Sequence, residues 1–169
     1  RESAPEVIRS LRGLGVEKVI VLTGDNRRTT EAVATAVGVD DYEAELLPED
    51  KVSVIRSLQA THNHVAMVGD GVNDAPAMAE STVSIAMGAI GSDAAIETSD
   101  IALMSDDLTR LPWLIRHSRR TRTIIGQNIA LSVGIKAVFI GMAFFEIATL
   151  WGAIAADMGA SLLVIGNGL

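Results

Sequence analysis

Three polar segments in the first half of the sequence carry side chains suited to phosphoryl chemistry: residues 23–26 (TGDN), Lys51 and residues 70–74 (DGVND). A threonine hydroxyl with adjacent backbone N–H groups can hold phosphoryl oxygens, and a lysine ammonium can neutralise their charge. Two carboxylates four residues apart on a glycine-containing turn suit a hard, oxygen-liganded cation such as Mg²⁺. Together the three segments predict a phosphoryl-transfer site, where positioning and electrostatics do most of the work.

The first and third segments each follow a short apolar run, residues 18–22 (KVIVL) and 65–69 (VAMVG). The run at 18–22 suits a parallel strand that is buried on both faces, and the run at 65–69 is predicted to be a second strand. Further strands are predicted at 83–87 and 101–104, and helices at 5–13, 27–37, 48–59, 75–80 and 93–98. This alternation predicts an α/β fold with a parallel sheet. Ligands of such sheets bind beyond the carboxyl ends of the strands, where both segments fall.

Taken singly, each segment has a simpler interpretation. The TGDN segment is compatible with an ordinary turn, Lys51 with a solvated helix charge, and Gly-Asp-Gly with a common loop. Only their order and their strand-end context favour a site. Two other features are interpreted as structural: His62 and His64 as part of a surface loop, and Met142 and Met158 as packing residues.

Charge is distributed very unevenly along the 169 residues, whose net charge is −7. Residues 1–109 carry 8 basic and 19 acidic side chains, residues 110–122 carry five arginines and no acid, and residues 123–169 carry three charges. With 49% hydrophobic residues and a mean hydropathy of +0.33, this pattern indicates a membrane protein. The pI of about 4.9 argues against a general nucleic-acid binder. The lack of cysteine excludes disulfides and thiolate metal sites within this sequence.

Three regions are therefore predicted: an α/β part over 1–107, a basic juxtamembrane helix over 108–122, and a two-helix membrane hairpin over 123–169. About 20 apolar residues suffice to cross a bilayer. The arginines before the first span place the α/β part in the cytoplasm and predict a multi-pass protein of the cell membrane. Two buried helices of a soluble core are the alternative. Because the sequence opens on Arg1 and stops inside an apolar run, we expect a piece of a longer protein.

Four strings carry a resemblance to a known family: VLTGDN (21–26), LPEDKVSVIRSL (47–58), VAMVGDGVNDAPAMAES (65–81) and SIAMG (84–88). They resemble the phosphorylation domain of P-type ATPases, which has a haloacid-dehalogenase-like, Rossmann-like fold. The resemblance covers nearly the whole sequence, since the family follows this domain with membrane helices. It implies that residues 1–107 are the second portion of that domain, and that ATP and Mg²⁺ are used.

The resemblance also implies roles for particular residues. The residues implied to hold the phosphoryl group are Thr23, Gly24, Asp25, Lys51 and Asn73. The residues implied to bind Mg²⁺ are Asp70 and Asp74.

One part of the family pattern is missing from the sequence. The family's nucleophile is an aspartate in an Asp-Lys-Thr-Gly-Thr segment, and no such segment occurs here. The nucleotide-binding and actuator domains and the earlier membrane helices are missing as well. The resemblance therefore implies a C-terminal portion that needs these parts as partners and is inactive alone.

The apolar tail resembles the zinc, cadmium and lead exporting branch of the family, which has a lysine and an Asp-x-Gly in its last two helices. Here Lys136 and Asp157-Met158-Gly159 match that pattern. The resemblance implies Asp157 as a ligand of the transported Zn²⁺, Cd²⁺ or Pb²⁺, Lys136 as its counter-charge and Asn128 as a further member. The Tyr-Asn pair and Met-rich Ser-Ser motif of the copper branch do not occur.

The sequence thus predicts part of an ATP-driven exporter of divalent soft metals in a lipid bilayer. Two alternatives remain open. A soluble phosphatase of the same fold would share Thr23, Lys51 and Asp70, but would have no use for residues 123–169. A non-catalytic Mg²⁺-binding membrane module is what the piece would amount to chemically by itself.

Overall fold

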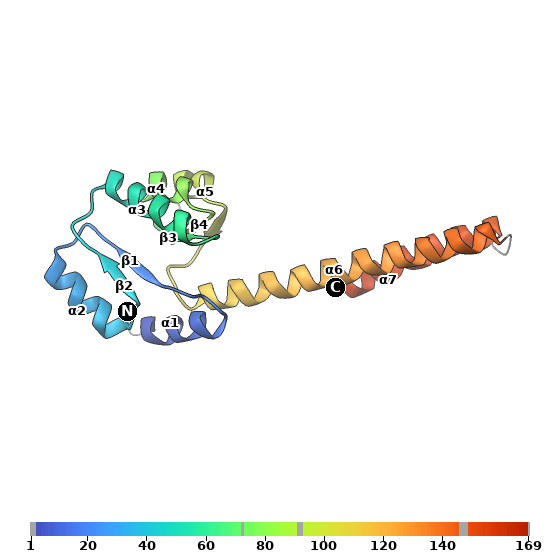
Figure 1. Cartoon of the computed structure of the whole chain (residues 1–169), viewed down its shortest axis with the longest axis horizontal. Coiled ribbons are helices and arrows are strands. Elements are labelled where there is room, and N and C mark those ends of the chain that lie inside the picture. The colour runs from blue at the N-terminus through green and yellow to red at the C-terminus, as the bar shows by residue number, and fades with distance from the viewer. Residues whose placement is uncertain (1–2, 72, 91–92, 146–148, 169) are drawn as a thin grey trace. The chain divides into compact units, whose positions relative to one another are not determined.

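The computed structural model describes residues 3–71, 73–90, 93–145 and 149–168. The chain divides into two compact units, Arg1–Trp113 and Leu114–Leu169. The first unit is an α/β domain, and the second is formed by two helices (Figure 1). Each unit is described by itself below.

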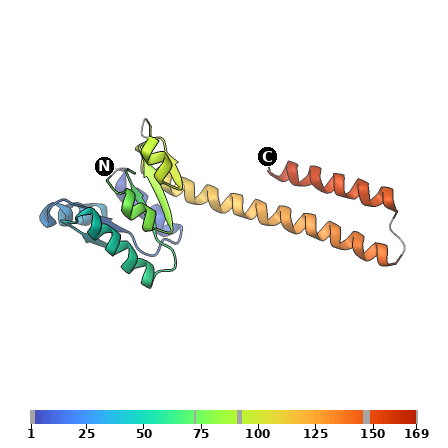
Figure 2. The same ribbon diagram turned by 90° about the horizontal axis from the view of Figure 1, so that it is seen from above.

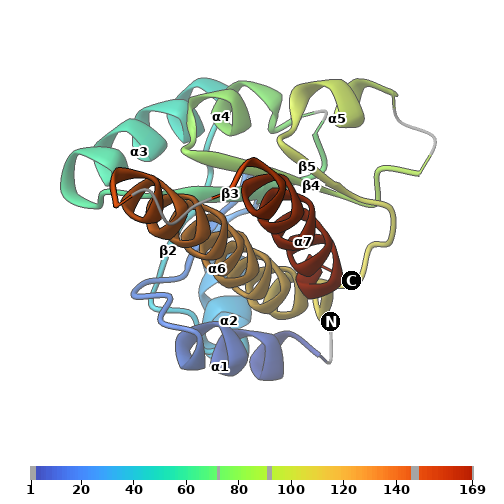
Figure 3. The ribbon, with the colours of Figure 1, turned by 90° about the vertical axis from the view of Figure 1, so that its right-hand side faces the viewer.

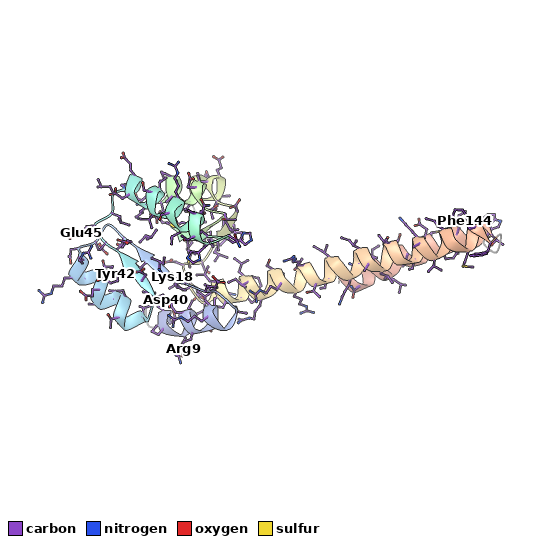
Figure 4. All side chains as sticks on the ribbon, in the orientation of Figure 1. Arg9, Lys18, Asp40, Tyr42, Glu45 and Phe144 are labelled. Atoms are coloured by element: carbon purple, nitrogen blue, oxygen red, sulfur yellow. The ribbon has the colours of Figure 1, made fainter. Side chains whose placement is uncertain are left out.

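The first sheet of the α/β unit is a βαβ arrangement. Strands β1 (Ile20–Leu22) and β2 (Asp41–Glu43) pair in parallel, with Ile20 opposite Asp41. Helix α1 (Ala4–Gly13) precedes β1, and helix α2 (Arg27–Val37) connects β1 to β2. Asp40 ties the start of this sheet together: its carboxylate accepts hydrogen bonds from Val19 N and from the Arg12 guanidinium, both at 2.8 Å. Lys18 and Asp40 lie beside the strands in Figure 4.

The second sheet has three parallel strands, β3 (Ala66–Gly69), β4 (Val83–Met87) and β5 (Ile101–Leu103), in that order. Helices α3 (Pro48–Thr61), α4 (Ala75–Glu80) and α5 (Asp93–Thr98) lie in a row along one face of it (Figure 3). The core between these layers is built from small and flexible side chains, namely Ile55, Met67, Ala77, Met78, Ala86, Ala89 and Ala95. Leu22 of β1 packs against the same core, so both sheets share it.

The parallel α/β fold that the sequence predicts is confirmed, but three details differ. β2 is not predicted, because its Asp-Tyr-Glu sequence lacks the apolar pattern of a strand. The strands form two ladders rather than one sheet. β1 is half-buried along its length, whereas the sequence predicts burial on both faces. The last two differences share one cause: among the described residues, β1 pairs with β2 alone.

Helix α6 (Arg110–Phe144) runs without a break for 35 residues, joining the predicted basic helix to the first predicted span. It is long and apolar enough to cross a membrane, with a mean hydropathy of 1.6 in its most apolar window. Helix α7 (Leu150–Gly168) runs back beside α6 (Figure 2). Of the residues the structure describes, only α6 meets the length and composition of a membrane span. The second span therefore stays a prediction.

Candidate functional site

The turn after β3 holds the carboxylate of Asp70 in a fixed position. Asn73 donates to it twice, from its backbone N at 3.1 Å and from its side-chain Nδ2 at 3.2 Å. Gly71 makes the turn possible, because its φ of +74° favours glycine and a Cβ there would lie 2.7 Å from Cα of Ala95. The carboxylate remains exposed, as a group that meets a ligand must be.

Asp74, four residues further on, is engaged by Lys51. Lys51 Nζ lies 2.5 Å from Asp74 Oδ1, and the two side chains are only 14% and 18% exposed. Limited contact with water strengthens the attraction between the charges. Gly69 leaves room for this pair, because a Cβ there would lie 2.8 Å from Asp74 Oδ2. Lys51 reaches the turn from the first part of α3, and Asp74 directly precedes α4.

The loop after β1 lies at the start of the helix that carries Lys51. Thr23 Oγ1 accepts a hydrogen bond from Asp25 N at 3.1 Å, and Thr23 O accepts one from Leu46 N at 3.0 Å. A Cβ on Gly24 would lie 3.3 Å from Leu46 O. Leu47 directly precedes α3, and its backbone N donates to the Asp50 carboxylate at 2.9 Å. The structure thus gathers Lys51, Asp70, Asn73 and Asp74, and places Thr23 and Gly24 by contact with the start of α3.

The donor set around Asp70 fits a shared Mg²⁺ site better than a complete protein cage. Among the described residues, no three His, Cys, Asp or Glu side chains gather where they could hold a metal ion. Mg²⁺ is commonly held by one or two carboxylates together with phosphate oxygens and water. Asp70 is suited to such a role, while Asp74 has a lysine as its partner.

A second polar cluster connects α6 and α7. Lys136 Nζ lies 3.8 Å from Asp157 Oδ1. Asn128, predicted with this pair, contacts two other residues of α7: its Oδ1 accepts from Asn167 Nδ2 at 2.8 Å, and its Nδ2 donates to Val164 O at 3.4 Å. The sequence interpretation missed Asn167, although an asparagine in an apolar run is an identifiable signal for a helix contact.

The two sequence features interpreted as structural are the histidine pair and the two methionines. His62 directly follows α3, and its Nδ1 lies 3.8 Å from the Glu17 carboxylate. Met158 is 65% exposed on α7.

Comparison with known proteins shows which proteins the chain resembles. Residues 1–82 match the haloacid dehalogenase-like hydrolase family, in agreement with the parallel α/β fold. Over all 169 residues the chain is 52% identical to a probable cadmium-transporting ATPase of Staphylococcus aureus (strain MRSA252), of which it covers 23%. It is 41% identical over 172 residues to a cadmium, zinc and cobalt-transporting ATPase of Bacillus subtilis (strain 168), of which it covers 24%.

A solved structure agrees with these sequence matches. The crystal structure of a zinc-transporting PIB-type ATPase in the E2.Pi state matches the whole chain, with 43% sequence identity and a TM-score of 0.91. The chain is therefore a homologue, along its whole length, of the cadmium- and zinc-transporting P-type ATPases, as its motifs indicate. It spans about a quarter of the length of these proteins, covering 27% of the solved chain.

Proposed function

We propose that the chain is the C-terminal portion of an ATP-driven pump that exports zinc, cadmium or lead ions from the cytoplasm. The observation that carries the proposal is the Lys51–Asp74 ion pair beside Asp70 and Asn73, an arrangement suited to a phosphoryl group and Mg²⁺. The names of the relatives, which are cadmium- and zinc-transporting ATPases, support the choice of substrate.

In the phosphoryl-transfer half of the proposal, the chain's own residues surround a phosphoryl group carried by an aspartate outside this sequence. The Thr23 hydroxyl donates a hydrogen bond to a phosphoryl oxygen. Thr23 Oγ1 itself accepts from Asp25 N, so its own proton is free to point outward. Gly24 offers its backbone N–H, and Asn73 its side-chain amide. Lys51 neutralises part of the negative charge while Asp74 holds its ammonium in position.

Asp70 is the proposed ligand of Mg²⁺, and Asp74 supports the site through Lys51. The cation, when bound, neutralises charge on the transferring phosphoryl oxygens. Asn73 orients the Asp70 carboxylate through its two hydrogen bonds, so the ligand is held in place before the cation arrives.

The division of the strands into two ladders supports a position for a further strand, the one that carries the missing aspartate. Among the described strands, β1 and β3 each have one ladder partner, and both contact one core through Leu22 and Met67. A strand between them would make one parallel sheet. Its carboxyl end would then lie between the Thr23 loop and the Asp70 turn, where the phosphoryl group is needed.

In the transport half of the proposal, Asp157 binds the metal ion and Lys136 is its counter-charge. Charged groups inside a membrane are costly and are kept for function or pairing. The 3.8 Å separation lets Lys136 neutralise Asp157 when no metal is bound. The two side chains are 63% and 66% exposed in this chain, which leaves room for ligands from the pump's other membrane helices.

The test uses the longer pump that contains this segment. We expect Asp157→Ala to abolish metal-stimulated ATP hydrolysis while leaving phosphorylation by inorganic phosphate intact, because the two sites are separate. The control is Ser161→Ala, which removes one hydroxyl bonded to the Asp157 carbonyl within the same helix. If Asp157→Ala pumps zinc normally and Lys136→Ala only lowers the melting temperature, the pair is a structural tether.

The alternatives predict different outcomes. A soluble phosphatase would leave the expressed 169-residue chain in the aqueous fraction, whereas α6 predicts recovery with membranes. A non-catalytic Mg²⁺-binding module would leave the pump's turnover unchanged when Asp70 is replaced by Asn.

A further inference from the structure

Residues 116–122 of α6 carry four arginines, which form a basic surface. Arg116, Arg119, Arg120 and Arg122 are all exposed. In the part of the chain that the structure describes, none of these four guanidinium groups forms an ion pair. Arg110, at the start of the helix, differs from them because its Nε lies 3.7 Å from the Asp107 carboxylate.

The four arginines are grouped on the helix and lie directly before its apolar part. Arg119 and Arg120 follow Arg116 by three and four residues, so these three side chains project from one side of α6. Arg122 is followed by Thr123 and then by the apolar run that begins at Ile124. At a rise of about 1.5 Å per residue, all four arginines lie within about 12 Å of that run along the helix axis. This is the depth of the headgroup region and the water next to it.

The chemistry of these groups selects an anionic phosphate. A guanidinium presents a planar fork of donors that matches phosphate oxygens, and it is always charged. Residues 1–109 carry more acidic than basic side chains, whereas residues 110–122 carry five arginines and no acid. The excess positive charge therefore lies directly before the apolar part of α6, at the level of the membrane surface. The nearest phosphates there belong to lipid headgroups.

We propose that this surface, Arg116, Arg119, Arg120 and Arg122, binds the headgroups of anionic phospholipids in preference to zwitterionic ones. The binding requires α6 to cross a bilayer, but neither the phosphoryl chemistry nor the metal transport proposed above. Its consequence is an anionic lipid shell around the cytoplasmic end of α6.

The preference is measured by fluorescence quenching in the full chain. The reporter carries Ile125→Trp, at an exposed position one turn beyond the arginines, with Trp113→Phe and Trp151→Phe. It is reconstituted in vesicles of phosphatidylcholine and phosphatidylglycerol in equal amounts, one lipid at a time being brominated on its acyl chains. We expect at least about twofold stronger quenching by brominated phosphatidylglycerol. The Trp113→Phe chain, which retains Trp151 at the start of α7, should be quenched equally by both lipids.

Charge variants of the reporter test whether the arginines cause the lipid preference. Arg119→Gln with Arg120→Gln should remove most of the preference, while Arg119→Lys with Arg120→Lys should retain part of it. Arg27→Gln with Arg28→Gln, the same change of charge on exposed positions of α2, should leave the preference intact.

Three results would overturn the proposal. The first is equal quenching of the parent reporter by the two lipids. The second is a preference that survives the Arg119→Gln and Arg120→Gln changes. The third is loss of the preference in millimolar inorganic phosphate but not in chloride of equal ionic strength, which would identify a site for soluble phosphate.

Discussion

The two carboxylates that follow β3 are held in different ways. Asp70 accepts hydrogen bonds from Asn73 and stays exposed, whereas Asp74 pairs with Lys51 and is 18% exposed. The sequence groups these residues, because they occur at strand ends and at a helix start. It does not predict that Asp74 has Lys51 as its partner, since that contact depends on the approach of α3 to the turn before α4.

The Lys51–Asp74 pair predicts a measurable energetic coupling. Lys51→Met should lower the free energy of unfolding of the α/β unit by about 1–3 kcal/mol, because it leaves a poorly solvated carboxylate without its counter-charge. Adding Asp74→Asn should recover part of that loss. Hydrogen exchange of β3 and α4 in increasing urea, on the full chain in detergent, gives the four free energies of the double-mutant cycle. Additive losses would mean that the two side chains do not interact.

A different carboxylate predicts how the fold responds to acid. The backbone N–H and the hydroxyl of Ser84 donate to Asp100 Oδ2 at 2.8 and 2.7 Å and hold the pKa of Asp100 below its ordinary value of 3.8. Ionised Asp100 therefore stabilises the fold above about pH 4, and this stabilisation is lost as the pH falls through the lowered pKa. In Asp100→Asn, the dependence of unfolding on pH below 4 should be shallower, since the amide oxygen can still accept but does not titrate. The measurement is a series of urea unfolding curves at different pH. If the free energy of unfolding falls below pH 4 just as steeply in Asp100→Asn, Asp100 does not cause that fall.

At the scale of elements, strongly patterned segments are predicted well and polar ones are not. The helices α1, α2, α4 and α5 and the strand β4 fall within one residue of their predicted bounds, because apolar spacing, prolines and glycines delimit them. β2 is missed because a three-residue strand of two acids and a tyrosine carries no pattern. The division into two ladders depends on which strands are neighbours, and that is set by contacts distant in sequence.

The contact between α6 and α7 depends on polar side chains more than on close packing. A Cβ on Gly134 or Gly159 would meet nothing within 4 Å among the described atoms, although small residues in membrane helices often mark a close helix approach. A Cβ on Gly152 would lie 4.0 Å from Cε1 of Phe139 on the opposite helix, which is ordinary van der Waals contact. Asn167 instead connects the helices, donating to Asn128 at 2.8 Å and to Gln127 at 3.4 Å.

Asn167→Ala should therefore loosen this end of the hairpin. Two interhelical hydrogen bonds are lost, worth about 1 kcal/mol together inside a membrane. Because the chain has no cysteine, Leu131→Cys and Leu163→Cys can carry spin labels at exposed positions without background. Their distance distribution should broaden in the Asn167→Ala chain and stay narrow in Ser161→Ala. Equally narrow distributions in all three chains would show that the hairpin does not need Asn167.

At the scale of the whole molecule, the function we propose has the chain supply the groups that stabilise a phosphoryl transfer rather than the group that receives it. Asp74 is neutralised by Lys51, and Asp70 accepts two hydrogen bonds from Asn73, so both carboxylates are poor nucleophiles. We therefore expect the 169-residue chain, incubated with labelled ATP and Mg²⁺, to form no acid-stable, hydroxylamine-labile acyl phosphate. Co-expression with the preceding part of the pump should restore the label on that part and make it depend on Lys51. A hydroxylamine-labile label on this chain alone would show that one of its own aspartates is the acceptor, and would reverse the roles proposed for Asp70 and Asp74.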